Sequence, residues 1–295
     1  MTAEVKMMQY PEVTPFYDKE TNTCSYVVKD PSSSYCAIID SVLNFDYASG
    51  AISYMSADKI ISFITEKHLF PKLHIETHVH ADHLSAAPYI QKRLGGKIAI
   101  DKHIVVIQEE FGRLFNEGTE FQRDGSQFDL LFEDNQKYSI GKLECIALYT
   151  PGHTPACMTH VIGDAAFVGD TLFMPDGGTA RADFPGGDAR VLYRSIQRVF
   201  ALPDATRIFI CHDYQPNGRE LKFETFVGEQ KEKNIHIHSS MTEDEFVVLR
   251  EARDKTLGMP RLILPSLQIN MRAGHFPAPD ADKNIYLKVP ISGLK

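Results

Sequence analysis

Metal-capable side chains crowd one short segment of this sequence, ETHVHADHLSAA at positions 76–87. Within it, His78, His80, Asp82 and His83 fall inside six residues. Because side chains alternate along an extended chain, the first two histidines point to the same side, and the other two donors follow at the next bend. The whole chain contains only 12 histidines, so this density differs from that of scattered surface or core histidines. Imidazole and carboxylate groups are ligands for transition metals, and the spacing therefore predicts a metal site.

Three more donor residues stand just after predicted strands. His153 lies in TPGHT, Asp170 in FVGDTLF and His212 in IFICHDY. Taken singly, they could be a turn histidine, a capping or turn aspartate and a histidine at a strand edge. Four ligands from one segment do not complete a two-metal site, however. The shared position of these three residues predicts that they join the first cluster.

Composition excludes several other functions. The chain has 31 basic and 39 acidic residues and a formal net charge of −8, which argues against binding to nucleic acid or to an anionic membrane. The amino-terminal sequence has no secretory pattern, and no apolar run is long enough to span a bilayer, so we expect a cytoplasmic protein. The five cysteines are odd in number and form no Cys-x-x-Cys pair, which argues against a disulfide framework or a thiolate zinc site.

Strands that alternate with helices must position these donors. The predicted helices are one that follows an N-cap at Ser56, one over 88–94 and one that Asp188 caps. The order of elements indicates a layered α/β architecture. The predicted strands are 25–29, 36–40, 73–76, 97–100, 143–149, 158–162, 165–169 and 207–211.

The character of the sequence changes beyond Gly218. We expect a charged helix over about 220–233, then a helix opened by Thr242 and Glu245 in capping-box spacing, and finally an extended tail that begins HFPAPDADKN. We therefore predict a catalytic domain over 1–235 and an appendage over 236–295 that packs on the same domain.

The ordered motifs THVHADH, TPGHT, GDTLF and CHDY resemble the metallo-β-lactamase superfamily. The resemblance implies an α/β fold, a four-layer αββα sandwich with the metal site at one edge of two packed sheets. Here the sandwich would carry the C-terminal helical and extended appendage. In its two-metal form, the resemblance assigns His78, His80 and His153 to one ion and Asp82, His83 and His212 to the other. Asp170 would be able to bridge the two ions.

Two longer stretches resemble one branch of that superfamily, the persulfide dioxygenases (sulfur dioxygenases). These are GDTLFMPDGGTARADFPGGDARVLYRSI, followed by HDY, and the later LPSLQINMRAG. A closer resemblance still is to bacterial β-lactamase hydrolase-like proteins, whose metal domain sits within this branch. The branch implies one non-haem Fe(II) per chain, held by His78, His153 and Asp170, which leaves three coordination positions open for reactants. The residues His80, Asp82, His83 and His212 would then form hydrogen bonds around the iron.

The implied reaction oxidises glutathione persulfide, or a related persulfide, with O2 to sulfite and free thiol. The alternative is a hydrolase of glutathione thioesters like glyoxalase II, in which two Zn ions share Asp170 and a hydroxide. A metal-binding sensor without turnover is a third reading, which open coordination positions disfavour. Lactam hydrolysis is disfavoured because lactamases of this type commonly have a cysteine near the second metal, at the position where this chain has Asp170.

For the substrate, motif position points to Arg181 as the cation that holds a glutathione carboxylate, and Tyr214 could donate a hydrogen bond. Where persulfide dioxygenases of animals and plants have Asn-Pro-Arg, this chain has Asn234, Ile235 and His236. The identity of the thiol carrier is therefore open. The expected partners are a small-molecule persulfide and O2, with no nucleic acid and no membrane, and we expect a homo-oligomer, specifically a dimer. Possible replacement cations are Arg219, Lys222 and Arg272.

Overall fold

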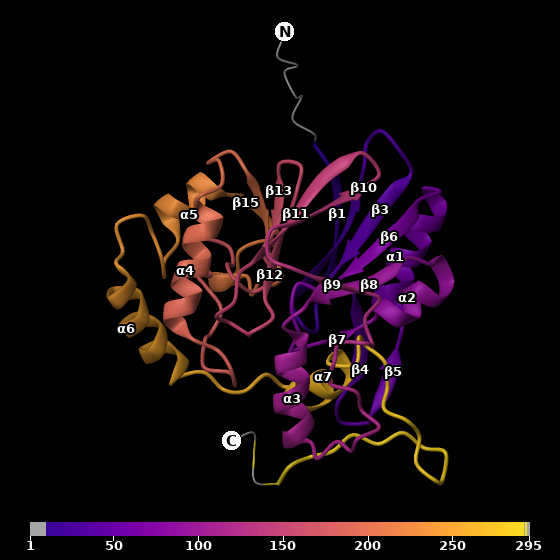
Figure 1. Ribbon diagram of the computed structural model, residues 1–295. Coiled ribbons are helices and arrows are strands. Elements are labelled where there is room, and N and C mark those ends of the chain that lie inside the picture. The colour runs from indigo at the N-terminus through magenta and orange to yellow at the C-terminus, as the bar shows by residue number, and fades with distance from the viewer. Residues whose placement is uncertain (1–9, 292, 294–295) are drawn as a thin grey trace.

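The computed structural model describes residues 10–291 and 293. Its centre is a pair of six-stranded sheets that pack face to face (Figure 1). The first sheet has the order β1-β2-β3-β6-β8-β9, and the second has the order β10-β11-β12-β13-β14-β15. The strands of the first sheet are Glu12–Asp18, Thr23–Lys29, Tyr35–Ile39, Phe70–Ile75, Lys97–Asp101 and Leu130–Phe132. Those of the second are Gln136–Ile140, Leu143–Tyr149, Met158–Ile162, Ala165–Phe167, Arg207–Phe209 and Glu224–Phe226.

Helices cover both outer faces of the sheet pair (Figure 1). On one side α1 and α2 pack on the first sheet, and on the other α4, with α5 and α6 beside it, packs on the second. This is the predicted four-layer αββα sandwich. The helices are α1 (Met55–Glu66), α2 (Ala87–Leu94), α3 (Ile104–Leu114), α4 (Ala189–Phe200), α5 (Val227–Lys233), α6 (Glu243–Asp254) and α7 (Ile263–Asn270).

The space between the sheets is filled by aromatic and aliphatic side chains. Tyr26 of β2 makes edge contacts with Phe167 of β13 and Phe209 of β14, with ring centroids 5.4 and 5.5 Å apart. All three rings are buried, which favours the sandwich through removal of apolar surface from water. This core holds the ends of both sheets at a fixed separation.

Most predicted elements are confirmed. Asp188 caps α4, because its side chain accepts a hydrogen bond from the backbone N of Val191 at 2.9 Å. Thr242 and Glu245 form the predicted capping box of α6. The 207–211 strand is shorter than predicted, because β14 ends at Phe209.

Two local predictions are wrong. Ser56 does not cap α1, which begins one residue earlier, and its hydroxyl instead donates to Asp18 Oδ1 at 2.9 Å. Of the helix predicted over 220–233, only the second half is helical in the structure, as α5. The residues before it form β15, which pairs with β14 and supplies backbone hydrogen-bond partners to that edge of the sheet. Tertiary pairing therefore overrides the helical propensity of this charged segment.

The C-terminal residues return to the sandwich. Helix α6 packs against α4, and α7 packs against β7 (Leu84–Ser85). β7 belongs to a small three-stranded sheet with β4 (Val42–Asp46) and β5 (Ala51–Ser53). Over 275–291 the described chain has no helix or strand, as predicted for a tail, and it makes a turn at 281–283. The division into 1–235 and 236–295 stays a prediction. No helix within the described residues has the length and apolar character that a membrane span requires.

Candidate metal centre

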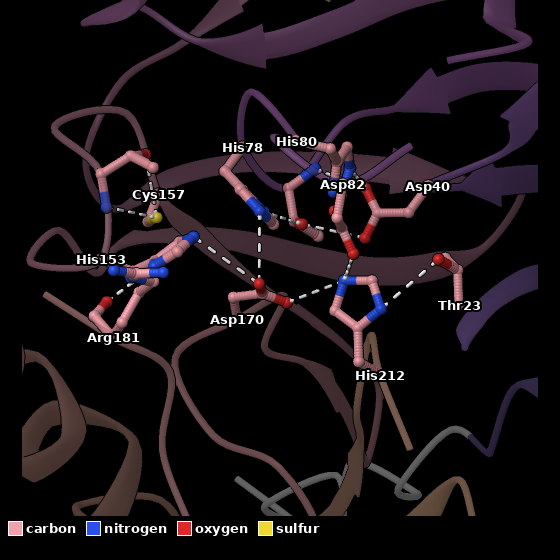
Figure 2. Close-up of polar contacts among 12 residues, drawn as sticks. Thr23, Asp40, His78, His80, Asp82, His153, Cys157, Asp170, Arg181 and His212 are labelled. Atoms are coloured by element: carbon pink, nitrogen blue, oxygen red, sulfur yellow. Dashed lines mark hydrogen bonds and ion pairs between the residues drawn. The ribbon is translucent and has the colours of Figure 1, made fainter. Parts of the chain in front are cut away.

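The seven predicted donors meet at one edge of the sandwich, where loops leave four strands. The 78–83 loop follows β6, and His153, Asp170 and His212 follow β11, β13 and β14 (Figure 2). The two sheets are tied together at this edge, because Cys24 at the start of β2 donates its backbone N to Cys211 O at 2.7 Å. Strands far apart in sequence therefore deliver their ends to one place.

His78, His153 and Asp170 form one cluster, which we call the three-donor group. Asp170 Oδ2 lies 3.8 Å from His78 Nε2 and 3.6 Å from His153 Nε2, and all three side chains are buried. Their donor atoms lie within 4.8 Å of one another. Two imidazoles and one carboxylate at this spacing can hold one metal ion on one face.

Hydrogen bonds behind the ligating atoms fix both histidines. His153 Nδ1 donates to the backbone O of Arg181 at 2.8 Å. Thr77 Oγ1 donates to Asp40 Oδ2 at 2.9 Å, so its lone pair is left to accept from His78 Nδ1 at 3.0 Å. Both rings therefore carry their proton on Nδ1 and turn a free Nε2 toward Asp170. Such partners set the tautomer and orientation of metal-ligating histidines.

The other four donors lie beside this group. His212 Nε2 is 3.1 Å from Asp82 Oδ2 and 3.3 Å from Asp170 Oδ1, so Asp170 stands between the two sets as a bridging ligand would. His80 and Asp82 come together with His83. Within the part of the chain that the structure describes, Asp82, His83 and His212 do not assemble into one three-donor cluster.

Unpartnered atoms at this edge fit a metal ion. Buried polar atoms almost always have hydrogen-bond partners, and an orphaned one costs about 1–3 kcal/mol. Five such atoms belong to the donor residues at this edge, and metal ions bound there would give them partners. They are His78 Nε2, His80 Nδ1, His83 Nε2, Asp170 Oδ1 and His212 Nε2.

The electrostatics agree with a missing positive charge. Burial raises the pKa of Asp170, and His212 and His153 oppose this effect. The ion-pair partners of the carboxylate are histidines, and no lysine or arginine side chain within the described residues pairs with it. Burial and then His80 lower the pKa of His78 well below its usual value. A neutral imidazole is the form that binds metal, so the chain holds this ligand ready for an ion.

Asp40 is a site residue that sequence reasoning missed. It directly follows β3, and its carboxylate accepts a hydrogen bond from the backbone N of Thr77 at 2.8 Å and contacts His80 Nε2 at 3.0 Å. Glu76 Oε2 lies 3.3 Å from the same nitrogen. Burial alone would lower the pKa of His80, but the Asp40 and Glu76 carboxylates raise it well above its usual value. Both carboxylates contact Nε2, which leaves Nδ1 as the ring nitrogen of His80 without a hydrogen-bond partner. The only signal in the sequence was an aspartate at the end of an apolar strand.

The C-terminal helix α7 also supports the metal loop. Asn270 Nδ2 donates to the backbone O of His80 and of His83, both at 2.8 Å, and Asn270 Oδ1 accepts from Ser85 N at 2.8 Å. One buried amide thus holds both sides of the bend that carries the donors. Asn270 lies in the stretch LPSLQINMRAG, but its contact with the loop could not be predicted from spacing.

We expect Asn270→Ala to loosen this bend. Three hydrogen bonds are lost and buried backbone atoms lose partners, so the variant should unfold with a free energy lower by about 1–3 kcal/mol and should retain less metal after dialysis. Thermal unfolding and metal analysis measure the two effects. Gln122→Ala is the control, because Gln122 also donates its amide to a backbone O, that of Thr119, but lies in an exposed turn. Equal behaviour of the two variants would contradict a supporting role for α7.

The donors open onto a cavity of about 500 Å³, which we call the site cavity. Its inner wall includes Asp82, His153 and Asp170, and both predicted substrate residues, Arg181 and Tyr214, line it. Cavities of this size suit small molecules, and the metal donors lie at its floor.

The guanidinium of Arg181, which we predicted to hold a substrate carboxylate, already has partners within the protein. Its Nε and Nη2 donate to Asp183 at 2.6 and 2.8 Å, and its Nη1 donates to Gly258 O at 2.7 Å. The guanidinium is therefore already paired, while its backbone O orients His153. Tyr214 is 56% exposed, and its ring stacks near His212 with centroids 5.9 Å apart.

The replacement cations suggested by the sequence do not line the site cavity. Arg219 pairs with Asp213 and Asp176, and Arg272 pairs with Glu117. The wall that the described residues form includes neither of them, nor Lys222.

Residues 21–212 match the model of the metallo-beta-lactamase superfamily, and this span contains all seven donors. The chain belongs to this superfamily. Membership agrees with the αββα sandwich and with a metal cofactor at its edge. It confirms the fold and the superfamily that the motifs predicted.

Individual relatives carry different functional names. A "Beta-lactamase hydrolase-like protein" of Agrobacterium fabrum is 50% identical over 97% of this chain and 66% of its own length. "Glyoxylase B2" of Dictyostelium discoideum is 42% identical over the full length of both chains. "Persulfide dioxygenase ETHE1, mitochondrial" of Homo sapiens is 28% identical over 85% of this chain and 84% of its own. The predicted closeness to hydrolase-like proteins is thus confirmed.

A solved structure superposes on most of the chain. The crystal structure of ETHE1 from Myxococcus xanthus has a TM-score of 0.71 and 26% sequence identity, and the match covers 90% of this chain and 100% of that one. The structural match extends beyond residue 212, where the superfamily match ends, because it covers 90% of this chain.

Proposed function

We propose that this protein is a persulfide dioxygenase with one iron ion per chain. The observation that carries the proposal is the three-donor group, in which two imidazoles and one carboxylate lie within 4.8 Å of one another at the floor of the site cavity. This is the donor set of iron oxygenases that keep open coordination positions. The similarity to ETHE1 proteins in sequence and structure supports the same assignment.

The proposed reaction is GSSH + O2 + H2O → GSH + H2SO3, where GSSH is glutathione persulfide. When bound, Fe(II) would supply the redox chemistry that joins oxygen to sulfur. The chain would contribute orientation and polarity. His153 and His78 are held by their Nδ1 hydrogen bonds, and burial of the donors keeps bulk water from them. Tyr214, at the cavity wall, can donate its hydroxyl proton to an anionic sulfur or oxygen.

A second candidate is a dinuclear zinc hydrolase of glutathione thioesters. The observation that favours it is that all seven donors are present at one edge and that Asp170 faces both sets. The relatives named "Glyoxylase B2" and "Beta-lactamase hydrolase-like protein" are in line with it. Two zinc ions would lower the pKa of a bound water and generate a nucleophile near neutral pH.

Metal analysis and two assays decide between these functions. The protein is purified without oxygen, its iron and zinc are counted, and oxygen uptake with glutathione persulfide is compared with cleavage of S-lactoylglutathione. We expect about one iron per chain and oxygen uptake that requires the persulfide. Two zinc ions with thioester cleavage and no oxygen uptake would establish the hydrolase instead.

Asp82→Ala gives an independent test of the number of metals. In a one-iron enzyme Asp82 only contacts His212, so the variant should keep its iron and lose activity by about tenfold, the low end of the effect of groups around a metal site. In a two-metal enzyme Asp82 is a ligand, and the variant should lose one of its two ions. The metal-to-protein ratio separates these outcomes. Asp124→Ala serves as the control, since Asp124 is an exposed aspartate in a loop outside the site cavity wall.

A further inference from the structure

The mouth of the site cavity is built by the segment that follows α6. Residues 257–262 line it, together with Arg253 in the last turn of the helix. Leu257 and Met259 are 38% and 57% exposed, so the segment forms an accessible rim. This part of the chain lies beyond the residues that match the superfamily model.

Four arginines line the site cavity, and they divide into two pairs. Arg181 is neutralised by Asp183, and Arg250 by Asp254, with a closest contact of 2.6 Å in each ion pair. The side chains of Arg253 and Arg261 form no hydrogen bond or ion pair with any residue that the structure describes. Arg261 is attracted only at longer range by the Asp46 carboxylate, which accepts backbone hydrogen bonds of its own.

His236, the residue that the resemblance to persulfide dioxygenases places at the position of an arginine, does not add a positive charge to the cavity. It is buried, and its Nδ1 accepts a hydrogen bond from Thr179 N at 3.0 Å. Burial and then the charges of Arg250 and Arg253 lower the pKa of His236 to about 4, so it is neutral near pH 7. The cationic character of the cavity therefore lies at the rim, on Arg253 and Arg261.

One exposed acidic side chain shares the cavity wall. Glu20 lies in the turn after β1, and its carboxylate also has no partner among the described side chains. The other two acidic residues of the wall, Asp82 and Asp170, belong to the metal centre. The part of the cavity away from the metal thus presents two free positive charges and one free negative charge.

We propose that Arg253 and Arg261 bind the two carboxylates, and Glu20 the ammonium group, of a peptide-like thiol whose sulfur reaches the metal centre. Glutathione has this charge pattern, whereas an inorganic polysulfide is an anion without carboxylates or an ammonium group. The inference rests on the proposed function for the position of the sulfur. Arginine is suited to this role because its planar guanidinium binds a carboxylate through two hydrogen bonds. A free pair of guanidiniums also lets a chain of net charge −8 attract an anionic substrate locally.

Binding of S-methylglutathione to the metal-loaded protein tests this proposal without turnover, because the methylated sulfur carries no persulfide. Isothermal calorimetry gives the dissociation constant for the wild type and for Arg253→Gln, Arg261→Gln and Glu20→Gln. We expect each arginine variant to bind about three- to tenfold more weakly, as for partly exposed charge-assisted contacts, and the double variant more weakly still. The matched control is Lys255→Gln, an exposed cation of the same segment that does not line the site cavity.

The diethyl ester of S-methylglutathione, which lacks both carboxylate charges, separates ion pairing from damage to the fold. It should bind the wild type weakly and bind the arginine variants no more weakly than the wild type. Unchanged affinity of the double variant for S-methylglutathione, or equal losses for the acid and the ester, would overturn the subsite. The proposed dioxygenase fails by a different result, the absence of persulfide-dependent oxygen uptake, which leaves this binding measurement intact.

Discussion

Asp170→Ala is expected to abolish stable metal loading and, with it, every metal-dependent activity of the protein. Asp170 is the only anionic member of the three-donor group, and its two oxygens face His78 and His153 on one side and His212 on the other. Loss of groups that merely surround a metal weakens binding by 10- to 100-fold, so loss of this ligand should exceed about a hundredfold. Competition with a chelator and elemental analysis measure the change.

The same variant should leave the metal-free protein at least as stable as the wild type. Burial raises the pKa of Asp170 against the opposing effect of His212 and His153, so the charged carboxylate is costly when no metal is bound. Thermal unfolding with and without metal would show stabilisation by metal in the wild type and none in the variant.

Asp164→Asn is the matched control for Asp170→Ala. Asp164 is also buried and follows β12, but it forms an ion pair with Arg207 at 2.7 Å, away from the donors. Its replacement should lower the unfolding free energy by about 1–3 kcal/mol and leave metal loading intact. A full complement of metal in Asp170→Ala would contradict the three-donor group as the metal site.

The donors could be predicted from the sequence because each is placed by a short local pattern. His153, Asp170 and His212 follow apolar strand segments directly, and the strand ends of one sandwich edge lie close together whatever the intervening loops do. The 78–83 cluster was visible from spacing alone. For these residues, local periodicity and turn chemistry contain most of the three-dimensional information.

The supporting residues could not be predicted, because their partners are distant in sequence. Asp40 reaches Thr77 and His80 only because β3 pairs with β6 in parallel, and Asn270 reaches the loop from 187 and 190 positions away. A buried amide or carboxylate with no local motif looks like any polar residue at the end of an element. The strand β15 was missed for the same reason, because its partner β14 supplies the hydrogen bonds that stabilise it.

Arg181 shows the limit of inference from motif position. The motif places it correctly at the site cavity, but a near neighbour in the same motif, Asp183, occupies its guanidinium. What reaches the metal centre is its backbone O, which holds His153 Nδ1 at 2.8 Å. A role of the backbone O cannot be predicted from the type of side chain. Among the described residues of the cavity wall, the cations without an ion-pair partner are Arg253 and Arg261, which belong to none of the sequence motifs.

Gly152→Ala is expected to displace His153 by a backbone clash. Gly152 has φ +131°, and an added Cβ would overlap the backbone N and Cα of Leu192 in the first turn of α4. Neither side can yield easily, because Leu192 is buried and Asp188 N donates to Gly152 O at 2.9 Å. We expect a loss of about 3–5 kcal/mol in unfolding free energy and loss of metal, measured by urea unfolding and metal analysis. Gly50→Ala separates the two costs, since Gly50 also has a positive φ, +69°, but open space around it, and should cost only about 1 kcal/mol. If both variants lose stability equally and keep their metal, close packing of the TPGHT loop on α4 is not what positions His153.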